Sequence, residues 1–435
     1  MDNILQAVFA RLVSRGSLTI TTVRGTTLTF GDGTGEEVRV RFTDTRAELA
    51  VVLDPHLYLG ELFMDGRLIV ERGTIYGFLE LVLRETGGDA KLVPAHIMSR
   101  IRHLASRLFG GNNPLRSRRN VTHHYDLDRR FYRIFLDKDF QYSCAYYERP
   151  DCTLEEAQLA KQRLVTAKLA VKPDSRVIDI GSGWGGLALY MKEIAGAREV
   201  LGITLSTEQL SAARERARER GLEADVNFEL QDYRALEGTF DRIVSVGMFE
   251  HVGPRYYQTF FDKCHERLAP DGVMLLHTIG FLDGPWDPNP WIDKYIFPGG
   301  HLPALSQIVT AIERSGLIVT DIECLRLHYA KTLVEWRRRF MARREEVLDL
   351  YDERFCRMWE FYFAGSEASF RYGNLGVFQI QCAHHVDALP ITRDYIAARI
   401  SDLRNTEIRR GMTESLRGKV REAEVRPIIP RRKHG

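Results

Sequence analysis

A glycine-dense turn after a short apolar run carries the clearest chemical signal in the sequence. The run spans residues 177–180 and includes Asp179. The glycines of the turn are Gly181, Gly183, Gly185 and Gly186. The first, second and last of them fit the spacing Gly-x-Gly-x-x-Gly, which lets a backbone turn sharply and approach a ligand closely. On its own, this turn fits a dinucleotide site, an S-adenosylmethionine site or an ordinary strand–turn–helix corner.

The residues after the next two predicted strands favour one of these ligands. A dinucleotide site needs an acid at the end of the second strand to hold the ribose hydroxyls, and this sequence has none there. The polar residues after the two strands are Thr204, Ser206, Gln209, Gln231, Asp232 and Tyr233. Their amide and acid groups are suited to the edge of a purine, and Asp179 is placed to approach a methionine ammonium group. We therefore predict that S-adenosylmethionine binds at the turn.

The elements around these residues alternate between strands and helices. Strands are predicted at residues 176–180, 200–204, 226–230, 242–246 and 273–277. Helices are predicted at residues 153–170, 185–194, 207–220 and 255–268. Such alternation implies an α/β fold with a parallel sheet and right-handed crossovers. A strand at 317–323, a long helix at 331–350, an aromatic helix at 354–370 and a strand at 377–381 complete a Rossmann-like domain over residues 123–405.

A smaller α+β domain is predicted over residues 1–90. It begins with a short amphipathic helix and continues with alternating runs, and the turn at residues 31–33 predicts a hairpin between the two strands that flank it. Residues 91–122 form a basic linker between the two domains, and residues 406–435 form a charged, basic C-terminal tail.

Composition sets the outer limits of the interpretation. The chain has 435 residues and a formal net charge of +2, which is enough length for two or three packed domains. Its six cysteines contain no Cys-x-x-Cys pair, so we expect a reduced, intracellular protein without a metal site. The first 20 residues lack the continuous apolar core of a signal peptide, and no apolar run approaches the ~18 residues that span a bilayer.

The basic linker leaves three interpretations open. Residues 90–125 contain no acid and carry several arginines, including Arg100, Arg102 and Arg107, interleaved with aliphatic residues at near-helical spacing. A basic amphipathic helix suits an anionic membrane surface. A linker helix with a solvated basic face explains the same pattern. Nucleic acid is disfavoured, because no recognisable nucleic-acid module accompanies the charge.

Several sequence blocks together resemble the cyclopropane-fatty-acyl-phospholipid synthases and the related mycolic-acid cyclopropane synthases and methyltransferases. Besides the glycine turn, the blocks are residues 124–127, 141–146, 231–234, 241–253, 276–280 and 291–298. The resemblance implies a class I S-adenosylmethionine-dependent methyltransferase domain. The N-terminal domain is similar to that of the phospholipid-acting members, which favours intact phospholipid as the substrate.

The resemblance also implies a mechanism and site residues. A methyl group is transferred from S-adenosylmethionine to a cis double bond, and bound bicarbonate removes a proton so that the ring closes. By motif position, the residues around bicarbonate are Cys144, Glu250, His277, Ile279 and Tyr329, with Tyr142 and Ser143 at the cofactor carboxylate. Many relatives carry cysteine where Ser182 stands. The family further implies a homodimer that acts at the cytoplasmic face of an anionic membrane.

Two rival functions remain at this point. A methyltransferase with the same fold would leave a methyl or methylene branch on the chain. A non-catalytic lipid-binding protein would keep the basic linker without needing the set of Cys144, Glu250 and His277. An aromatic stripe at spacing i, i+3, i+4, i+7 fits a wall of the acyl channel or, more simply, ordinary core packing. Its members are Phe355, Met358, Trp359 and Tyr362.

Overall fold

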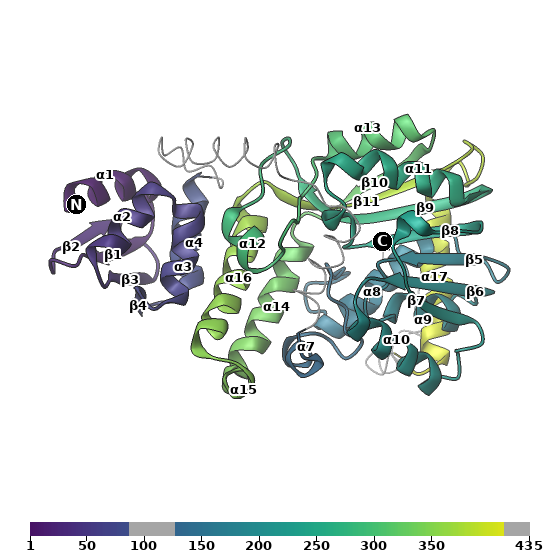
Figure 1. Ribbon diagram of the computed structural model, residues 1–435, viewed down its shortest axis with the longest axis horizontal. Helices are drawn as coiled ribbons and strands as arrows, with labels where there is room; N and C mark the ends of the chain where they lie inside the picture. The colour runs from purple at the N-terminus through teal and green to yellow at the C-terminus, as the bar shows by residue number, and fades with distance from the viewer. Residues whose placement is uncertain (87–126, 413–435) are drawn as a thin grey trace, which may run out of the picture.

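A seven-stranded mixed sheet organises the larger part of the chain in the computed structural model, which describes residues 1–86 and 127–412 (Figure 1). Its strand order is β10-β11-β9-β8-β5-β6-β7. The strands are β5 (Arg176–Ile180), β6 (Glu199–Thr204), β7 (Val226–Leu230), β8 (Phe240–Val246), β9 (Leu268–Phe281), β10 (Ile318–Cys324) and β11 (Leu375–Ala383). The predicted parallel pairing holds from β7 through β9, whereas β11 and β10 are added antiparallel.

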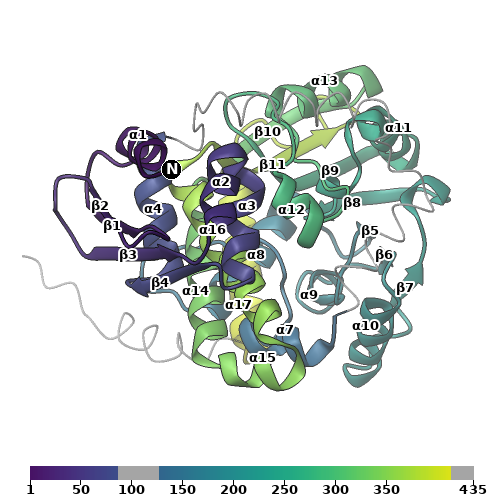
Figure 2. The ribbon, with the colours of Figure 1, turned by 60° about the vertical axis from the view of Figure 1, so that its left-hand side comes forward.

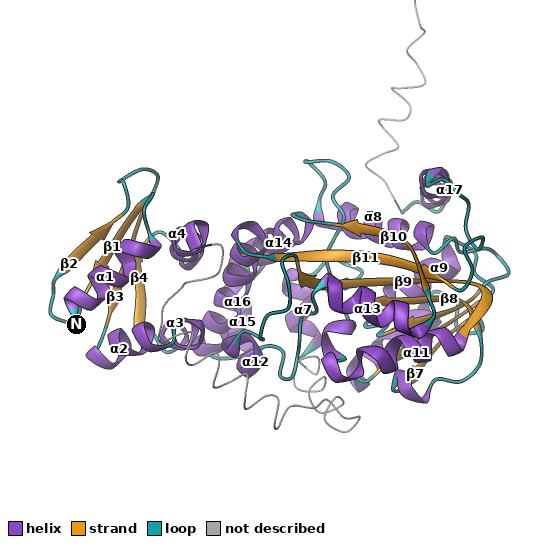
Figure 3. Ribbon diagram, turned by 90° about the horizontal axis from the view of Figure 1, so that it is seen from above, coloured by secondary structure: helices purple, strands orange, loops and turns teal. Residues whose placement is uncertain are grey.

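Helices cover both faces of this sheet, as Figure 3 shows from above. The covering helices are α8 (Leu154–Lys168), α9 (Gly186–Glu193), α10 (Thr207–Glu219), α11 (Tyr257–Arg267), α13 (Leu305–Ser315) and α17 (Asp394–Arg409). Successive residues of β5 point to opposite faces: Val177 packs with α8, α9 and α17, and Ile178 packs with α11 and α13. Both neighbours are fully buried, which explains the continuous apolar character of this strand.

Two predicted elements have different bounds in the structure. The long helix expected at residues 331–350 is divided at Arg343 into α14 (His328–Ala342) and α15 (Arg344–Leu350). The residue types at 270–272 also predict a turn, but these residues lie inside the strand β9. The register with β8 passes from Leu268 directly to Val273, so residues 269–272 form a bulge that neither β8 nor β11 pairs.

The N-terminal unit is a four-stranded sheet covered by helices. Its elements are α1 (Asp2–Leu12), β1 (Ser17–Thr21), β2 (Thr27–Phe30), β3 (Glu37–Phe42), α2 (Thr45–Leu53), α3 (Pro55–Met64), β4 (Leu68–Arg72) and α4 (Ile75–Thr86). The strand order β2-β1-β3-β4 shows that the predicted hairpin across residues 31–33 is wrong. β1 lies between the two strands that this turn connects, and it pairs parallel with β3.

A layer of helices joins the two units (Figures 1 and 2). It consists of α7 (Arg129–Phe135), α12 (Pro290–Tyr295), α14, α15 and the 20-residue α16 (Glu353–Tyr372). Ala364 and Ala368 of α16 belong to the apolar core of the N-terminal unit, and a Cβ on Gly60 of α3 would overlap the Trp291 ring of α12. The N-terminal unit is thus packed directly on the layer that borders the sheet. In the described ranges, no helix is both long and apolar enough to cross a membrane.

Candidate active site

The glycine turn lies between β5 and α9, where its conformation requires glycine. Gly181, Gly183 and Gly185 have φ values of 84°, 54° and 81°. A Cβ on Gly181 would lie 2.6 Å from Met248 Cβ, and one on Gly185 would lie 2.7 Å from Phe228 Cζ. No described atom outside its chain neighbours lies within 4 Å of a Cβ built on Gly183, so the backbone there is open to a ligand.

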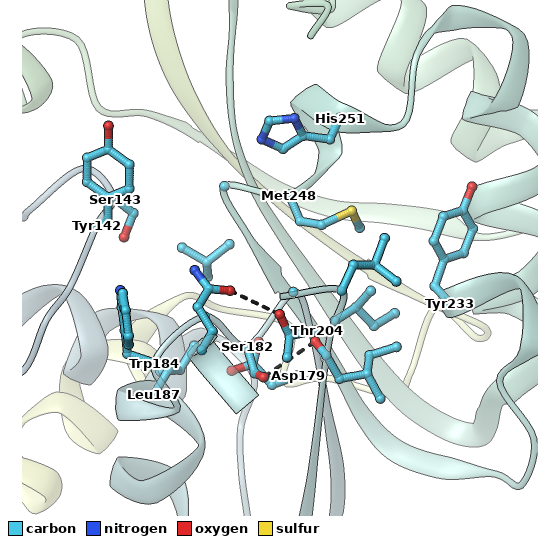
Figure 4. Close-up of a pocket in the computed structure, with 18 of the residues that line it drawn as sticks. Tyr142, Ser143, Asp179, Ser182, Trp184, Leu187, Thr204, Tyr233, Met248 and His251 are labelled. Atoms are coloured by element: carbon cyan, nitrogen blue, oxygen red, sulfur yellow. Dashed lines mark hydrogen bonds between the residues drawn. The ribbon is translucent and has the colours of Figure 1, made fainter. Parts of the chain in front are cut away.

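A cavity of about 140 Å³ opens above this turn (Figure 4). Of the predicted cofactor residues, those that line it are Tyr142, Ser143, Asp179, Gly181, Gly183, Thr204, Gln209, Gln231, Asp232 and Tyr233. Gly185 and Ser206 do not line it. The Ser206 hydroxyl oxygen instead accepts a hydrogen bond from the backbone nitrogen of Gln209 at 3.2 Å and caps the start of α10. The structure therefore brings most of the predicted cofactor residues together around one cavity, and Gly185 and Ser206 lie outside its lining.

Three polar side chains that line this cavity are held by hydrogen bonds or an ion pair within the protein. Thr204 Oγ1 donates to Gln209 Oε1 at 3.0 Å, which orients the amide toward the cavity. Asp232 forms an ion pair with Arg234 at 2.6 Å, so its carboxylate is held in place before any ligand binds. Ser182, at the position where many relatives carry cysteine, lines the cavity and donates weakly to the Ile203 carbonyl oxygen at 3.4 Å.

Lys161 of α8 is a cofactor-site residue that sequence reasoning missed. It lines the cavity, is fully buried, and donates to Ser143 Oγ at 2.9 Å and to Gln141 Oε1. Burial lowers the pKa of Lys161 and raises the pKa of Asp179, while attraction between the two charges opposes both shifts. The spacing from Ala157 to Lys161 and Leu164 on the apolar face of α8 is the signal that would have placed this lysine inside.

A second and larger cavity, of about 1010 Å³, contains all five predicted catalytic residues. They are Cys144 in the loop before α8, Glu250 in the short helix η2 (Phe249–His251), His277 and Ile279 on β9, and Tyr329 on α14. The two cavities share part of their lining, at Tyr142, Ser143, Gly247 and His251. In Figure 4, Tyr142 and Ser143 approach this junction from one side, and Met248 and His251 from above. A group held at the glycine turn therefore borders the larger cavity.

Glu250 is a buried carboxyl with one oxygen engaged. Its Oε1 accepts from the Ile279 amide nitrogen at 2.7 Å. Its Oε2 is buried and has no hydrogen-bond partner among the described residues. The Thr278 hydroxyl, which donates to the Ile279 carbonyl oxygen, lies close enough to Glu250 to oppose part of the rise in its pKa. Burial raises the pKa of Glu250 to about 7. The Oε2 atom of Glu250 can accept a proton or a hydrogen bond from a ligand. The backbone of Ile279, which the sequence predicted to contact an anion, instead donates to Glu250 and orients its carboxyl group.

Two histidines that line the larger cavity, His251 and His277, are neutral. Burial lowers the pKa of His277 to about 3 and the pKa of His251 to about 4. His277 Nδ1 lies 3.1 Å from Gln379 Nε2 on the adjacent strand β11. With Gln379 as the donor, the ring proton of His277 lies on Nε2, so the ring can donate a hydrogen bond without carrying a charge.

Cys144 and Tyr329 are held among aromatic rings. Burial raises the pKa of the Cys144 thiol, which therefore stays protonated, and its Sγ lies 3.3 Å from the Ala145 carbonyl oxygen. The Tyr329 ring packs against Phe370 and Trp336 at centroid distances of 4.8 and 5.8 Å. These surroundings are suited to an apolar substrate and to neutral donors.

The aromatic stripe on α16 is mainly core. Phe355 stacks on Tyr351 at 3.9 Å between centroids, and Trp359 packs against Phe131 at 4.7 Å. Only Tyr362 of the four lines the larger cavity among the described residues. The simpler interpretation, core packing, is confirmed for most of the stripe. No group of three His, Cys, Asp or Glu side chains that could hold a metal ion occurs within residues 1–86 and 127–412.

The fold and the cavity at the glycine turn define a class I S-adenosylmethionine-dependent methyltransferase. Residues 113–380 match the family model "Mycolic acid cyclopropane synthetase", and the chain belongs to this family. It is 41% identical over 337 residues to the cyclopropane-fatty-acyl-phospholipid synthase of Escherichia coli (strain K12), covering 78% of this chain and 85% of the relative.

Two further comparisons agree with this assignment. A protein of Pseudomonas putida named "Probable fatty acid methyltransferase" is 39% identical over 287 residues, covering 63% of this chain and 72% of the relative. The crystal structure of mycolic acid cyclopropane synthase CmaA1 complexed with SAH and CTAB has a TM-score of 0.58 and 35% identity, covering 61% of this chain and 97% of that one. The resemblance found in the sequence blocks is thereby confirmed at the level of the family.

Proposed function

We propose that the protein is a cyclopropane-fatty-acyl-phospholipid synthase, which adds a methylene group from S-adenosylmethionine across a cis double bond of a phospholipid acyl chain. The observation that carries this proposal is the junction of the two cavities. One lies at the glycine turn, and the other is mainly apolar and contains a buried Glu250 oxygen that has no hydrogen-bond partner in the part of the chain that the structure describes. The cofactor would be held by residues that line the cavity at the glycine turn, namely Tyr142, Ser143, Asp179, Gly181, Gly183, Gln209, Gln231 and Asp232.

The apolar cavity supports the chemistry in two ways. S-adenosylmethionine, when bound, supplies an electrophilic methyl group. An isolated double bond is a poor nucleophile, so the protein must hold it in line with that methyl group, and alignment of this kind supplies several kcal/mol. The cavity wall also excludes water, which would otherwise trap a cationic carbon on the acyl chain.

The residues around Glu250 fit a small oxyanion such as bicarbonate, which supplies a base when bound. The Glu250 Oε2 atom has no partner among the described residues and would accept the hydroxyl proton of that anion. His277 and Tyr329 would donate hydrogen bonds, and Cys144 would contribute through its backbone. Because the Ile279 backbone nitrogen donates a hydrogen bond to Glu250, Ile279 would orient the Glu250 carboxyl group.

The proposal is tested by incubating the protein with S-adenosylmethionine and vesicles of unsaturated phosphatidylglycerol. The expected result is a gain of one CH2 in the fatty esters, with loss of the alkene signals and appearance of ring signals in the proton spectrum. A gain with retained alkene protons, or with two additional hydrogens, would establish the rival branch-forming methyltransferase, which the Pseudomonas putida relative favours. No gain in mass would leave the lipid-binding protein.

We further propose that the protein acts as a homodimer on the inner face of an anionic membrane. The support for the membrane is the acid-free basic segment at residues 91–122, which lies outside the described residues. Sedimentation with anionic vesicles at low and high salt tests the membrane contact, and sedimentation velocity without lipid tests the dimer. Binding that is equal on neutral and anionic vesicles would contradict the electrostatic contact.

A further inference from the structure

The larger cavity continues from the catalytic residues into the N-terminal unit. Side chains that line it there include Phe9 and Leu12 of α1, Val51 of α2, and Leu79, Val82 and Leu83 of α4. Among the described lining residues of this unit, His56 is the one titratable side chain. We call this region the N-terminal branch of the cavity. Its wall is aliphatic, so it suits an apolar occupant.

Small residues of α16 form the opposite wall of this branch. Gly365, Ser366 and Ser369 line the cavity where α16 faces α4. A Cβ on Gly365 would lie 3.8 Å from Leu79 Cδ1, an ordinary contact, and apart from the backbone of its own helix no other described heavy atom lies within 4 Å of it. The space between the two helices therefore exists because short side chains stand where larger ones would fill it.

A hydrogen bond between the two walls and an ion pair to the end of α3 fix α16 to the N-terminal unit. Tyr372 of α16 donates to Glu80 of α4 at 2.5 Å, and Arg354 of α16 pairs with Asp65 at 2.8 Å. Next to the branch, Ala364 and Ala368 pack into the core of the N-terminal unit. The branch is therefore enclosed between two elements that are fixed to each other.

We propose that the N-terminal branch binds the methyl end of the acyl chain, so that the N-terminal unit determines how long a chain the enzyme accepts beyond the double bond. The inference rests on the proposed function. The headgroup end is excluded from the branch because burying an unpaired phosphate charge in an aliphatic pocket is very unfavourable. The charged lining residues Asp283, Asp287, Asp293 and Lys294 all come from the segment between β9 and the end of α12, outside the N-terminal unit. Its volume of about 1010 Å³ is at the upper end of the ~300–1,000 Å³ usual for ligand pockets, so it has room for a whole chain.

Filling the branch from the α16 side tests the proposal. Gly365→Leu projects a side chain toward Leu79, whereas Gly365→Ala adds a single methyl group that the geometry accommodates. Ala398→Leu, on the exposed face of α17, is the matched control. The substrates are vesicles of phosphatidylglycerols that share one double-bond position counted from the carboxyl group and differ by pairs of carbons beyond it. In Gly365→Leu, kcat/KM should fall roughly tenfold for each pair of methylenes displaced from the branch. The shortest chain should keep parental turnover, Gly365→Ala should lie between, and the control should match the parent.

Two results would overturn the chain-end site. One is an equal loss on every chain length, and the other is a loss that follows the length on the carboxyl side of the double bond in a second lipid series. If Gly365→Leu lowers the melting temperature, Val82→Phe fills the branch from the opposite wall and must give the same selectivity. Parental turnover separates this inference from the proposed function: no product on any lipid refutes the function, whereas product without a selectivity change refutes only the chain-end site.

Discussion

Replacing Glu250 by glutamine separates the chemistry of this side chain from its contribution to stability. Glutamine keeps a carbonyl oxygen that can accept from the Ile279 amide nitrogen, as Glu250 Oε1 does at 2.7 Å. It replaces the other oxygen, which is buried without a partner among the described residues, by an NH2 group that cannot accept a proton. We therefore expect cofactor binding to change little and turnover to fall roughly a hundredfold or more, as for the loss of a positioned proton acceptor.

The expected effect of this substitution on stability follows from the shifted pKa of Glu250. Its ordinary pKa is 4.5, and burial raises the pKa to about 7 in the folded protein. Between these two values the native state retains a proton that the unfolded state has released, so the free energy of unfolding of the parent falls as pH rises. At ~1.4 kcal/mol per pKa unit, the two titrations give a loss of about 2.5 kcal/mol between pH 5 and pH 8. Glutamine does not titrate, so the variant should not lose this stability. Between pH 5 and pH 8, its free energy of unfolding should therefore rise relative to that of the parent by the same amount.

Urea unfolding at both pH values measures this difference, and titration calorimetry with S-adenosylmethionine measures cofactor binding. Glu237→Gln, at an exposed position, is the matched control and should show neither effect. If the parent and Glu250→Gln lose stability in parallel from pH 5 to pH 8, Glu250 is not the buried titrating group described above. If cofactor affinity falls together with turnover, the role of Glu250 is structural.

Three further substitutions test other parts of the site. Lys161→Met removes the buried cation that donates a hydrogen bond to Ser143. It should weaken S-adenosylmethionine binding roughly ten- to a hundredfold, because a charge-assisted hydrogen bond contributes ~1.5–3 kcal/mol. Calorimetry measures this affinity, and an unchanged value would contradict the role of Lys161. Tyr329→Phe retains the ring packing and should lower turnover about tenfold or more with little change in melting temperature; a matching loss of stability would assign Tyr329 to the core. Replacing Arg100, Arg102 and Arg107 by serine should weaken binding to anionic vesicles by about 1 kcal/mol per residue and reduce its salt dependence, as measured by co-sedimentation; unchanged binding would remove this segment as the membrane contact.

Local patterns predicted the elements of the fold better than their pairing. The run at 176–180 and the periodicity of the helices that follow depend on neighbours in the chain, and both are confirmed in β5, α9 and α10. The antiparallel strands β10 and β11 and the parallel pair β1–β3 depend on contacts between distant segments. Alternation of polar and apolar residues does not specify such partners.

The same distinction applies to the site. Cys144, Glu250 and His277 lie in sequence blocks that could be matched, and the structure brings them into one cavity. Lys161 was missed because a lysine usually marks a solvated helix face, and its burial depends on Gln141 and Ser143 from another segment. The apolar residues of α4 that line the N-terminal branch were also missed, since periodicity shows which side chains are buried but not whether they face a core or a void.

One physical cause sets the charge state of four buried groups in the larger cavity. Burial lowers the pKa of His251 and His277 and raises that of Cys144, so all three are neutral near pH 7, while the same burial brings the pKa of Glu250 to about 7. A positive charge that develops on an acyl carbon beside these groups would therefore meet neutral His251 and His277, and it could be stabilised by an aromatic face such as that of Tyr362. Of these four groups, Glu250 changes charge near neutral pH, and turnover in excess bicarbonate should rise with pH through a step near 7. Saturating S-adenosylmethionine is needed in this assay, because burial also raises the pKa of Asp179 at the glycine turn to about 7. The step should be absent from the residual activity of Glu250→Gln, and its persistence there would assign the titration to another group.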